Sequence, residues 1–179
     1  MPKYEDYKKS FDFVESNQDY KRVVHNLNVS RNRRVKKVKD FLFDMLSYVD
    51  NDFKMSFLTL TFSDQVMNST TERARRVKVN RYLQKFAIQY VANIDFGGDT
   101  GREHYHAIVL YHKDYCPFDK WEKNGFYTNR PVAINDKSMV RLSNYINKLS
   151  YHAIKDTTQH DNTSYRLIYW TRKPISDII

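Results

Sequence analysis

The sequence predicts an α+β fold in which a central antiparallel sheet of about five strands is packed with helices. Three observations favour this fold: a segment with the two-residue periodicity of a strand, segments with helical spacing of apolar residues, and a Gly-rich turn between two apolar segments. Their order is helix, strand, helix, hairpin, helix, strand. A hairpin placed between helices is typical of a ferredoxin-like layer.

Two helices are predicted before the hairpin. Residues 32–49 carry apolar side chains at helical spacing and follow Ser30, a suitable cap. Residues 70–91 follow the capping-box pattern Ser69-x-x-Glu72. The apolar residues of this second helix are Val79, Leu83, Phe86 and Tyr90. Its outside is predicted to be basic, with Arg73, Arg75, Arg76, Lys78 and Arg81.

Residues 57–62 are predicted to form a central strand. Alternation places Leu58, Leu60 and Phe62 on one face, and Phe57, Thr59 and Thr61 on the other. Residues 93–96 and 103–111 are predicted to pair as a hairpin around the turn Gly97-Gly98-Asp99.

The segment after the hairpin, residues 114–130, is predicted to be irregular. A third helix is expected to start with Asp136 or Ser138 as its cap and to continue through Lys155, and residues 165–171 are predicted to form the closing strand. The whole chain has the length of one domain, in which we expect residues 1–50 to form an N-terminal helical extension to residues 51–179.

The composition excludes several classes of protein. Apolar residues make up 41% of the 179 residues, which is too much for a disordered chain, and no apolar run is long enough to cross a bilayer. The N-terminus lacks the apolar segment of a secretory signal, and Cys116 is the only cysteine. We therefore expect no membrane association, no internal disulfide, and a cytoplasmic location.

The charge balance favours a polyanionic partner. Thirty Lys and Arg residues stand against 21 Asp and Glu residues, giving a formal net charge of +9. Such an excess is typical of nucleic-acid binding, although basic charge also serves solubility. The basic residues that we predict to contact a nucleic-acid partner are Arg33, Arg34, Lys36, Arg75, Arg76 and Arg102.

The pattern His104-Tyr-His106 on a predicted strand points both imidazoles to the same face, close enough to share a metal ion. The turn at residues 97–101 can bring the Asp95 carboxylate beside them as a third ligand. The alternative is a pair of unrelated polar residues on a half-exposed strand.

Tyr145 and Lys148 lie three residues apart on the third predicted helix, so their side chains share one side of it. The tyrosine is then placed at the rim of the buried face. A tyrosine in that place is also a common core residue, and spacing alone leaves both interpretations open.

Three blocks of this sequence resemble, in order, the motifs of HUH endonucleases, specifically the rolling-circle replication initiators of plasmids, phages and small viruses. They are Phe57-Leu-Thr-Leu-Thr-Phe62, Asp95-Phe-Gly-Gly-Asp-Thr-Gly-Arg-Glu-His-Tyr-His106 and Tyr145-Ile-Asn-Lys148. With the residues after Trp170, the resemblance spans roughly residues 55–173. It implies a ferredoxin-like or RRM-like nuclease fold over residues 51–179.

The resemblance also implies a mechanism. His104, His106 and Asp95 would bind Mn or Mg, Tyr145 would attack a phosphate of single-stranded or hairpin origin DNA, and Lys148 would assist. The products would be a covalent 5′-phosphotyrosine and a free 3′-hydroxyl. A host helicase and polymerase would be the protein partners, since no Walker-type loop is present.

The sequence departs from the family pattern at several positions. The acidic ligand is often Glu in this family and is Asp95 here, and Leu149 stands where phage initiators have a second tyrosine. Tyr82-x-x-Lys85 repeats the tyrosine pattern but precedes the histidines, so we interpret Tyr82 as a packing residue. Two alternative functions are a single-tyrosine transposase of the same superfamily and a non-catalytic RNA- or DNA-binding module.

Overall fold

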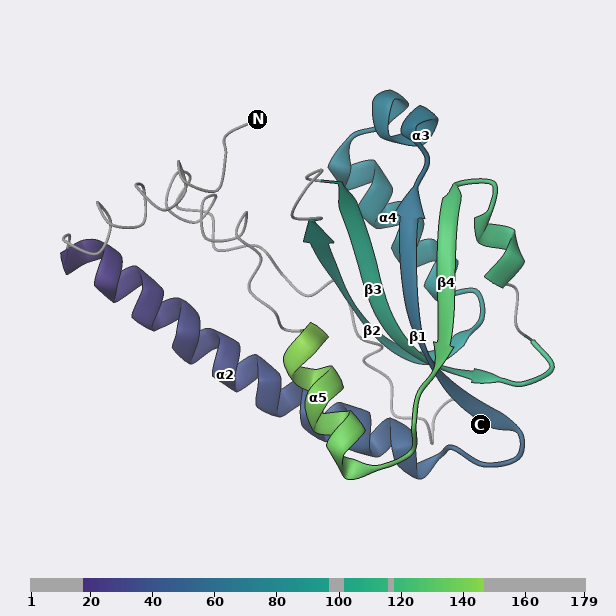
Figure 1. Ribbon diagram of the computed structural model, residues 1–179, viewed down its shortest axis with the longest axis horizontal. Helices are drawn as coiled ribbons and strands as arrows, with labels where there is room; N and C mark the ends of the chain where they lie inside the picture. Colours follow the sequence, from purple (N-terminus) through teal and green to yellow (C-terminus); the bar gives the residue numbers. More distant parts are fainter. Residues whose placement is uncertain (1–17, 97–101, 116–117, 147–179) are drawn as a thin grey trace.

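The computed structural model describes residues 18–96, 102–115 and 118–146 of the chain (Figure 1). Four antiparallel strands form one sheet in the order β2-β3-β1-β4. These strands are β1 (Phe53–Phe62), β2 (Ala87–Phe96), β3 (Glu103–His112) and β4 (Gly125–Pro131). The predicted α+β class and the antiparallel sheet are therefore confirmed. The predicted fifth strand, residues 165–171, lies outside the described residues.

The helices cover both faces of the sheet. They are α2 (Gln18–Ser47), α3 (Asp64–Ser69), α4 (Glu72–Leu83), the short 3-10 helix η1 (Phe118–Trp121) and α5 (Asp136–Ile146). In Figure 1, α4 lies behind the sheet, whereas α2 and α5 contact each other on its other side. None of the described helices is both long and apolar enough to cross a membrane.

Strand alternation divides the core into two clusters. Tyr105, Ala107 and Val109 of β3 join the cluster under α4, whereas Ile108 and Leu110 join the cluster under α2 and α5. The residues of β1 that were predicted to share one face belong to the cluster under α4: Leu58, Leu60 and Phe62. The even-numbered face of β3 also carries His104 and His106, which lie beyond the apolar part of that face.

The prediction of one helix over residues 70–91 is wrong. Helix α4 ends at Leu83 and β2 begins at Ala87, where it pairs with β3. Phe86 and Tyr90 are buried as predicted, but from the turn and the strand rather than from a helix. The cap is Thr71, whose hydroxyl accepts the Ala74 N–H at 3.3 Å, and not Ser69.

Two further elements differ from the predictions. Residues 114–130 are not irregular throughout, because η1 and the edge strand β4 fall within them. Strand β4 was not predicted, because most of its side chains are exposed and its sequence shows no alternation of apolar residues. Helix α2 begins before Ser30, so this serine does not cap it. Asn135, whose side chain accepts the Ser138 N–H at 2.9 Å, caps α5.

Gly125 allows β4 to start close against β1. Its φ is 155°, and a Cβ at this position would lie 2.1 Å from the Thr61 carbonyl oxygen. Only glycine tolerates such an approach. The end of β1 that carries Thr61 is therefore held by a contact that a side chain at position 125 would prevent.

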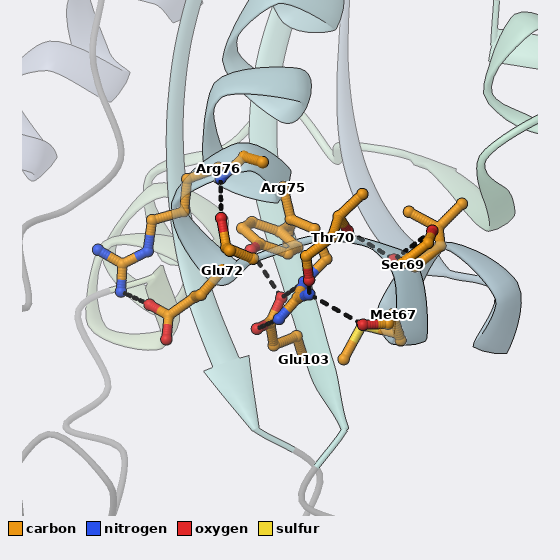
Figure 2. A network of polar contacts seen from close by, with 11 residues as sticks. Met67, Ser69, Thr70, Glu72, Arg75, Arg76 and Glu103 are labelled. Carbon is orange, nitrogen blue, oxygen red and sulfur yellow. Dashed lines mark hydrogen bonds and ion pairs between the residues drawn. The ribbon is translucent and has the colours of Figure 1, made fainter.

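A buried ion pair joins α4 to the start of β3 (Figure 2). The Arg75 guanidinium donates to both carboxylate oxygens of Glu103 and to the backbone carbonyls of Met67 and Thr70. Tyr105 donates to Glu103 Oε2 at 2.9 Å. The prediction that Arg75 lies on the outside of its helix is wrong, because Arg75 is only 7% exposed and its charge is used within the fold.

We expect Glu103→Gln to lower the free energy of unfolding by about 3 kcal/mol, because it leaves a buried guanidinium without its counter-charge. Urea unfolding measures the change. The matched control is Asp64→Asn, which removes the partner of Arg102 in an ion pair whose carboxylate is 85% exposed, and which should cost less than about 1 kcal/mol. Equal losses in the two variants would contradict the structural role of the buried pair.

Candidate functional site

The imidazoles of His104 and His106 are oriented by hydroxyls of the neighbouring strand. Antiparallel pairing places Thr61 opposite His104 and Thr59 opposite His106. Thr61 Oγ1 lies 3.0 Å from His104 Nδ1, and Thr59 Oγ1 lies 3.1 Å from His106 Nδ1. In the tautomer whose Nδ1–H donates to the threonine oxygen, the Nε2 atom of each ring carries the lone pair that can bind a ligand.

Asp95 extends the same face from β2. It pairs with His104 in the register of β2 and β3, and its Oδ2 lies 3.8 Å from His106 Nε2. The three residues predicted as metal ligands are thus neighbours on one face of the sheet.

The donor set fits a divalent cation in chemical type, since two imidazoles and a carboxylate are common ligands of transition metals. As placed in the part of the chain that the structure describes, no three His, Cys, Asp or Glu side chains stand close enough to hold an ion together. Paired residues of neighbouring strands have Cα atoms only about 5 Å apart. Asp95 and His104 are such a pair, and the Asp95 carboxylate also lies 3.8 Å from His106 Nε2, so each histidine has the carboxylate as a neighbour.

Burial lowers the pKa of His104 below its ordinary value, and the nearby charges of His106 and Arg102 lower it further, against the opposing effect of Asp95. A histidine with a lowered pKa is neutral at pH 7. Only the neutral imidazole has a lone pair for a metal, so the surroundings of His104 favour its use as a ligand.

Tyr145 of α5 lies beside the histidine face. Its ring is 5.2 Å from the ring of His106 and 5.6 Å from that of Phe57, in both cases edge to face. Phe57 in turn stacks on His106 at 5.5 Å. The side chain of Tyr145 is not buried in the core, because 43% of the residue is exposed.

The end of α5 is tied to the sheet next to this tyrosine. The Asn93 side-chain amide of β2 donates to the Ile146 carbonyl at 2.5 Å. A small cleft of about 10 Å³ lies between the two elements, lined by Asn93, Ile94, Asp95, His106, Tyr145 and Ile146. It has room for about one water molecule, so it marks where Tyr145 meets the histidine face rather than a ready-made substrate pocket.

Comparison with known proteins identifies the family. A family model described as replication-associated protein ORF2/G2P matches residues 55–162, which is more than half of the chain. The chain belongs to this family. No curated protein and no solved structure matched the chain. The family match confirms the replication part of the predicted function.

The match to the replication-associated family covers every residue that we predicted for the catalytic and metal sites. The structure brings four of them together: Asp95, His104, His106 and Tyr145. Lys148 lies outside the described residues.

The residues predicted to contact DNA have varied surroundings in this replication-associated protein. Arg33 and Lys36 are exposed on α2, and the side chain of Arg34 lies outside the described part. Arg76 forms an ion pair with Glu72. Arg102 donates to Asp64 Oδ1 and to the Phe62 carbonyl, both at 2.7 Å. With Arg75 buried, the exposed pair on α2 is the part of this set most open to a partner.

Sequence reasoning missed the supporting residues of the site, which are Phe57, Thr59, Thr61 and Asn93. Alternation had placed Phe57, Thr59 and Thr61 together on one face of a strand. The missing information was that this strand pairs with the histidine strand. The signal that could have found Thr59 and Thr61 is their spacing of two, which equals the spacing of His104 and His106.

Proposed function

We propose that this replication-associated protein is an HUH endonuclease that initiates rolling-circle replication by nicking single-stranded origin DNA. The single observation that supports it most is the position of Tyr145, whose exposed ring lies 5.2 Å from the ring of His106 on the face that also holds His104 and Asp95. The proposed nucleophile and the proposed metal donors, which come from elements far apart in the sequence, thus lie side by side. A hydrophobic packing role for Tyr145 would not require this neighbourhood.

In the proposed reaction, the Tyr145 hydroxyl oxygen bonds to the phosphorus of the scissile phosphodiester, and the bond from phosphorus to the 3′-oxygen breaks. One proton leaves the phenol and one proton ends on the departing 3′-oxygen, so the step is balanced. The products are a 5′-phosphotyrosine and a free 3′-hydroxyl that a host polymerase can extend. Lys148 is proposed to hold the phosphate or favour the deprotonated phenol.

His104, His106 and Asp95 would hold the divalent cation, Mn or Mg, in this proposal. When bound, such a cation would neutralise the negative charge of the phosphate, which otherwise repels a nucleophile. The threonines fix the two imidazoles, and Phe57 packs against both His106 and Tyr145, so the donors and the phenol keep their relative positions.

The covalent intermediate would also allow strands to be rejoined. The phosphotyrosine linkage replaces one phosphodiester with another, so attack by a 3′-hydroxyl restores the DNA and frees Tyr145 without ATP. The strand must be unpaired to reach the phenol, which implies melted or hairpin DNA and a host helicase.

The test of the proposed function is incubation of the full chain with Mn and a pool of single-stranded oligonucleotides labelled at the 3′ end. We expect a denaturant-resistant conjugate between protein and labelled DNA, because the 5′-phosphate of the downstream strand stays on Tyr145. If protein and DNA remain separate while the DNA is bound, the chain is a binding module.

We expect Thr59→Val to weaken Mn binding by about tenfold to a hundredfold, because His106 loses the partner that orients its ring. Titration calorimetry with Mn measures the affinity without any reaction. Thr59→Ser is the matched control, since it keeps the hydroxyl and should bind Mn as the parent does. Equal affinities for the valine variant and the parent would contradict a positioning role for Thr59.

A further inference from the structure

A second surface of the molecule is strongly basic and lies on the other side of the sheet from Tyr145. Helix α4 packs its residues Val79, Tyr82 and Leu83 on the sheet face opposite to the histidines (Figure 1). Between the outer side of α4 and the segment around η1 lies a groove of about 820 Å³. Six cationic side chains line it: Arg73, Lys78, Arg81, Lys85, Lys120 and Lys123.

Within the described part of the chain, the charge of this groove is not balanced. None of the described Asp or Glu residues lines the groove, although Asp119 and Glu122 are close in sequence to its wall. Among the described residues, none of the six cations forms an ion pair with a carboxylate. Bringing six positive charges together is unfavourable without a counter-charge, so the groove is suited to a polyanion.

The arrangement of the cations fits a chain of phosphates better than it fits a single phosphate. Arg73 and Arg81 are eight residues apart on α4, so they are separated by about 12 Å along its axis. Lys120 and Lys123, from the segment around η1, line the same groove. A row of cations along the groove follows an extended backbone, whereas one small anion would engage only part of it.

An aromatic ring at the groove favours an unpaired strand. Tyr115 lines the groove and is 50% exposed, and the Lys120 ammonium lies 6.0 Å from its ring centroid. A cationic groove with an exposed aromatic ring is the usual composition of single-strand binding surfaces, since the ring stacks on a base while the cations contact phosphates.

We propose that this basic groove is a second DNA-binding site, which holds a single strand of DNA on the face of the sheet opposite to Tyr145. That the nucleic acid is DNA rests on the proposed function. The groove and the histidine face are separated by the sheet, so the nucleotides in the groove are not the ones that are cut. The site would retain a neighbouring stretch of the displaced strand.

The salt dependence of binding tests the groove separately from nicking. In a Tyr145→Phe background, anisotropy of a labelled oligothymidylate gives the affinity over a series of salt concentrations. We expect Lys78→Gln with Lys123→Gln to make the slope of log affinity against log salt shallower by about 1.4, since each phosphate contact on a single strand contributes about 0.7. The matched control is Lys54→Gln with Lys137→Gln, two exposed lysines outside the groove and away from the basic part of α2, which should leave the slope unchanged.

A second pair of variants tests the preference for a single strand. We expect Tyr115→Leu to weaken oligothymidylate binding about tenfold and Tyr115→Phe to preserve it, because stacking needs only the ring. Equal slopes for the groove and control lysine pairs would overturn the proposal. The proposal would also be overturned if the groove variants changed the salt slope only for hairpin duplex DNA and not for the single strand. If the parent protein, which keeps Tyr145, forms no covalent conjugate, the proposed nicking is refuted. The salt slopes of the groove variants do not depend on that result, so the proposal of a second binding site is tested separately.

Discussion

We expect Tyr145→Phe to abolish the covalent protein–DNA conjugate while oligonucleotide affinity is retained. The substitution removes one oxygen atom, which in the proposed mechanism is the atom that bonds to phosphorus. The ring, and with it the contacts to His106 and Phe57, is kept. Because Tyr145 is 43% exposed, the change in stability should stay within about 0.5 kcal/mol. Denaturing electrophoresis of labelled DNA detects the conjugate, and anisotropy measures binding.

The control for this variant is Tyr115→Phe, which alters a tyrosine of similar exposure on the other side of the sheet. It should form the conjugate at the yield of the parent. A conjugate formed equally by the Tyr145→Phe variant would mean that another residue is the nucleophile, and the proposed role of Tyr145 would be given up.

We expect His104→Ala to reduce Mn-dependent cleavage by at least about a hundredfold. Loss of a residue that only orients a ligand already costs about tenfold to a hundredfold in metal affinity, and loss of the ligand itself should cost more. Cleavage is measured with a single-stranded oligonucleotide across a range of Mn concentrations, because a weakened site should recover in part at high metal. Circular dichroism of the variant checks that the sheet is intact.

The matched control is His112→Ala. This histidine lies on the same strand and the same face as His104 but at the far end of β3, where it packs against Phe53. It should leave the metal dependence unchanged. Full cleavage by the parent protein after treatment with a chelator would remove the metal from the mechanism altogether.

The sequence alone was misleading where one periodicity fitted two structures. Val79, Leu83, Phe86 and Tyr90 are spaced as on one helix, and all four are buried in the same core cluster. The first two reach it from α4, Phe86 from the turn that follows, and Tyr90 from β2. Burial was predictable from apolar spacing, but the end of the helix was not, because pairing of β2 with β3 overrides the local preference.

The sequence by itself determined which side chains share a face of a strand. His104 with His106, and Thr59 with Thr61, follow from the two-residue period, which is a local property of the backbone. The α+β class was likewise readable from the order and spacing of the predicted elements.

Only the tertiary structure decided which faces meet. The hydrogen bonds between threonines and histidines join residues 43 and 47 positions apart, and the Arg75–Glu103 pair joins residues 28 apart. Local periodicity carries no information about such pairings, because they depend on the strand order and on how α4 and α5 pack on the sheet. The same packing buried Arg75, which the sequence had placed outside, and brought Tyr145 to His106.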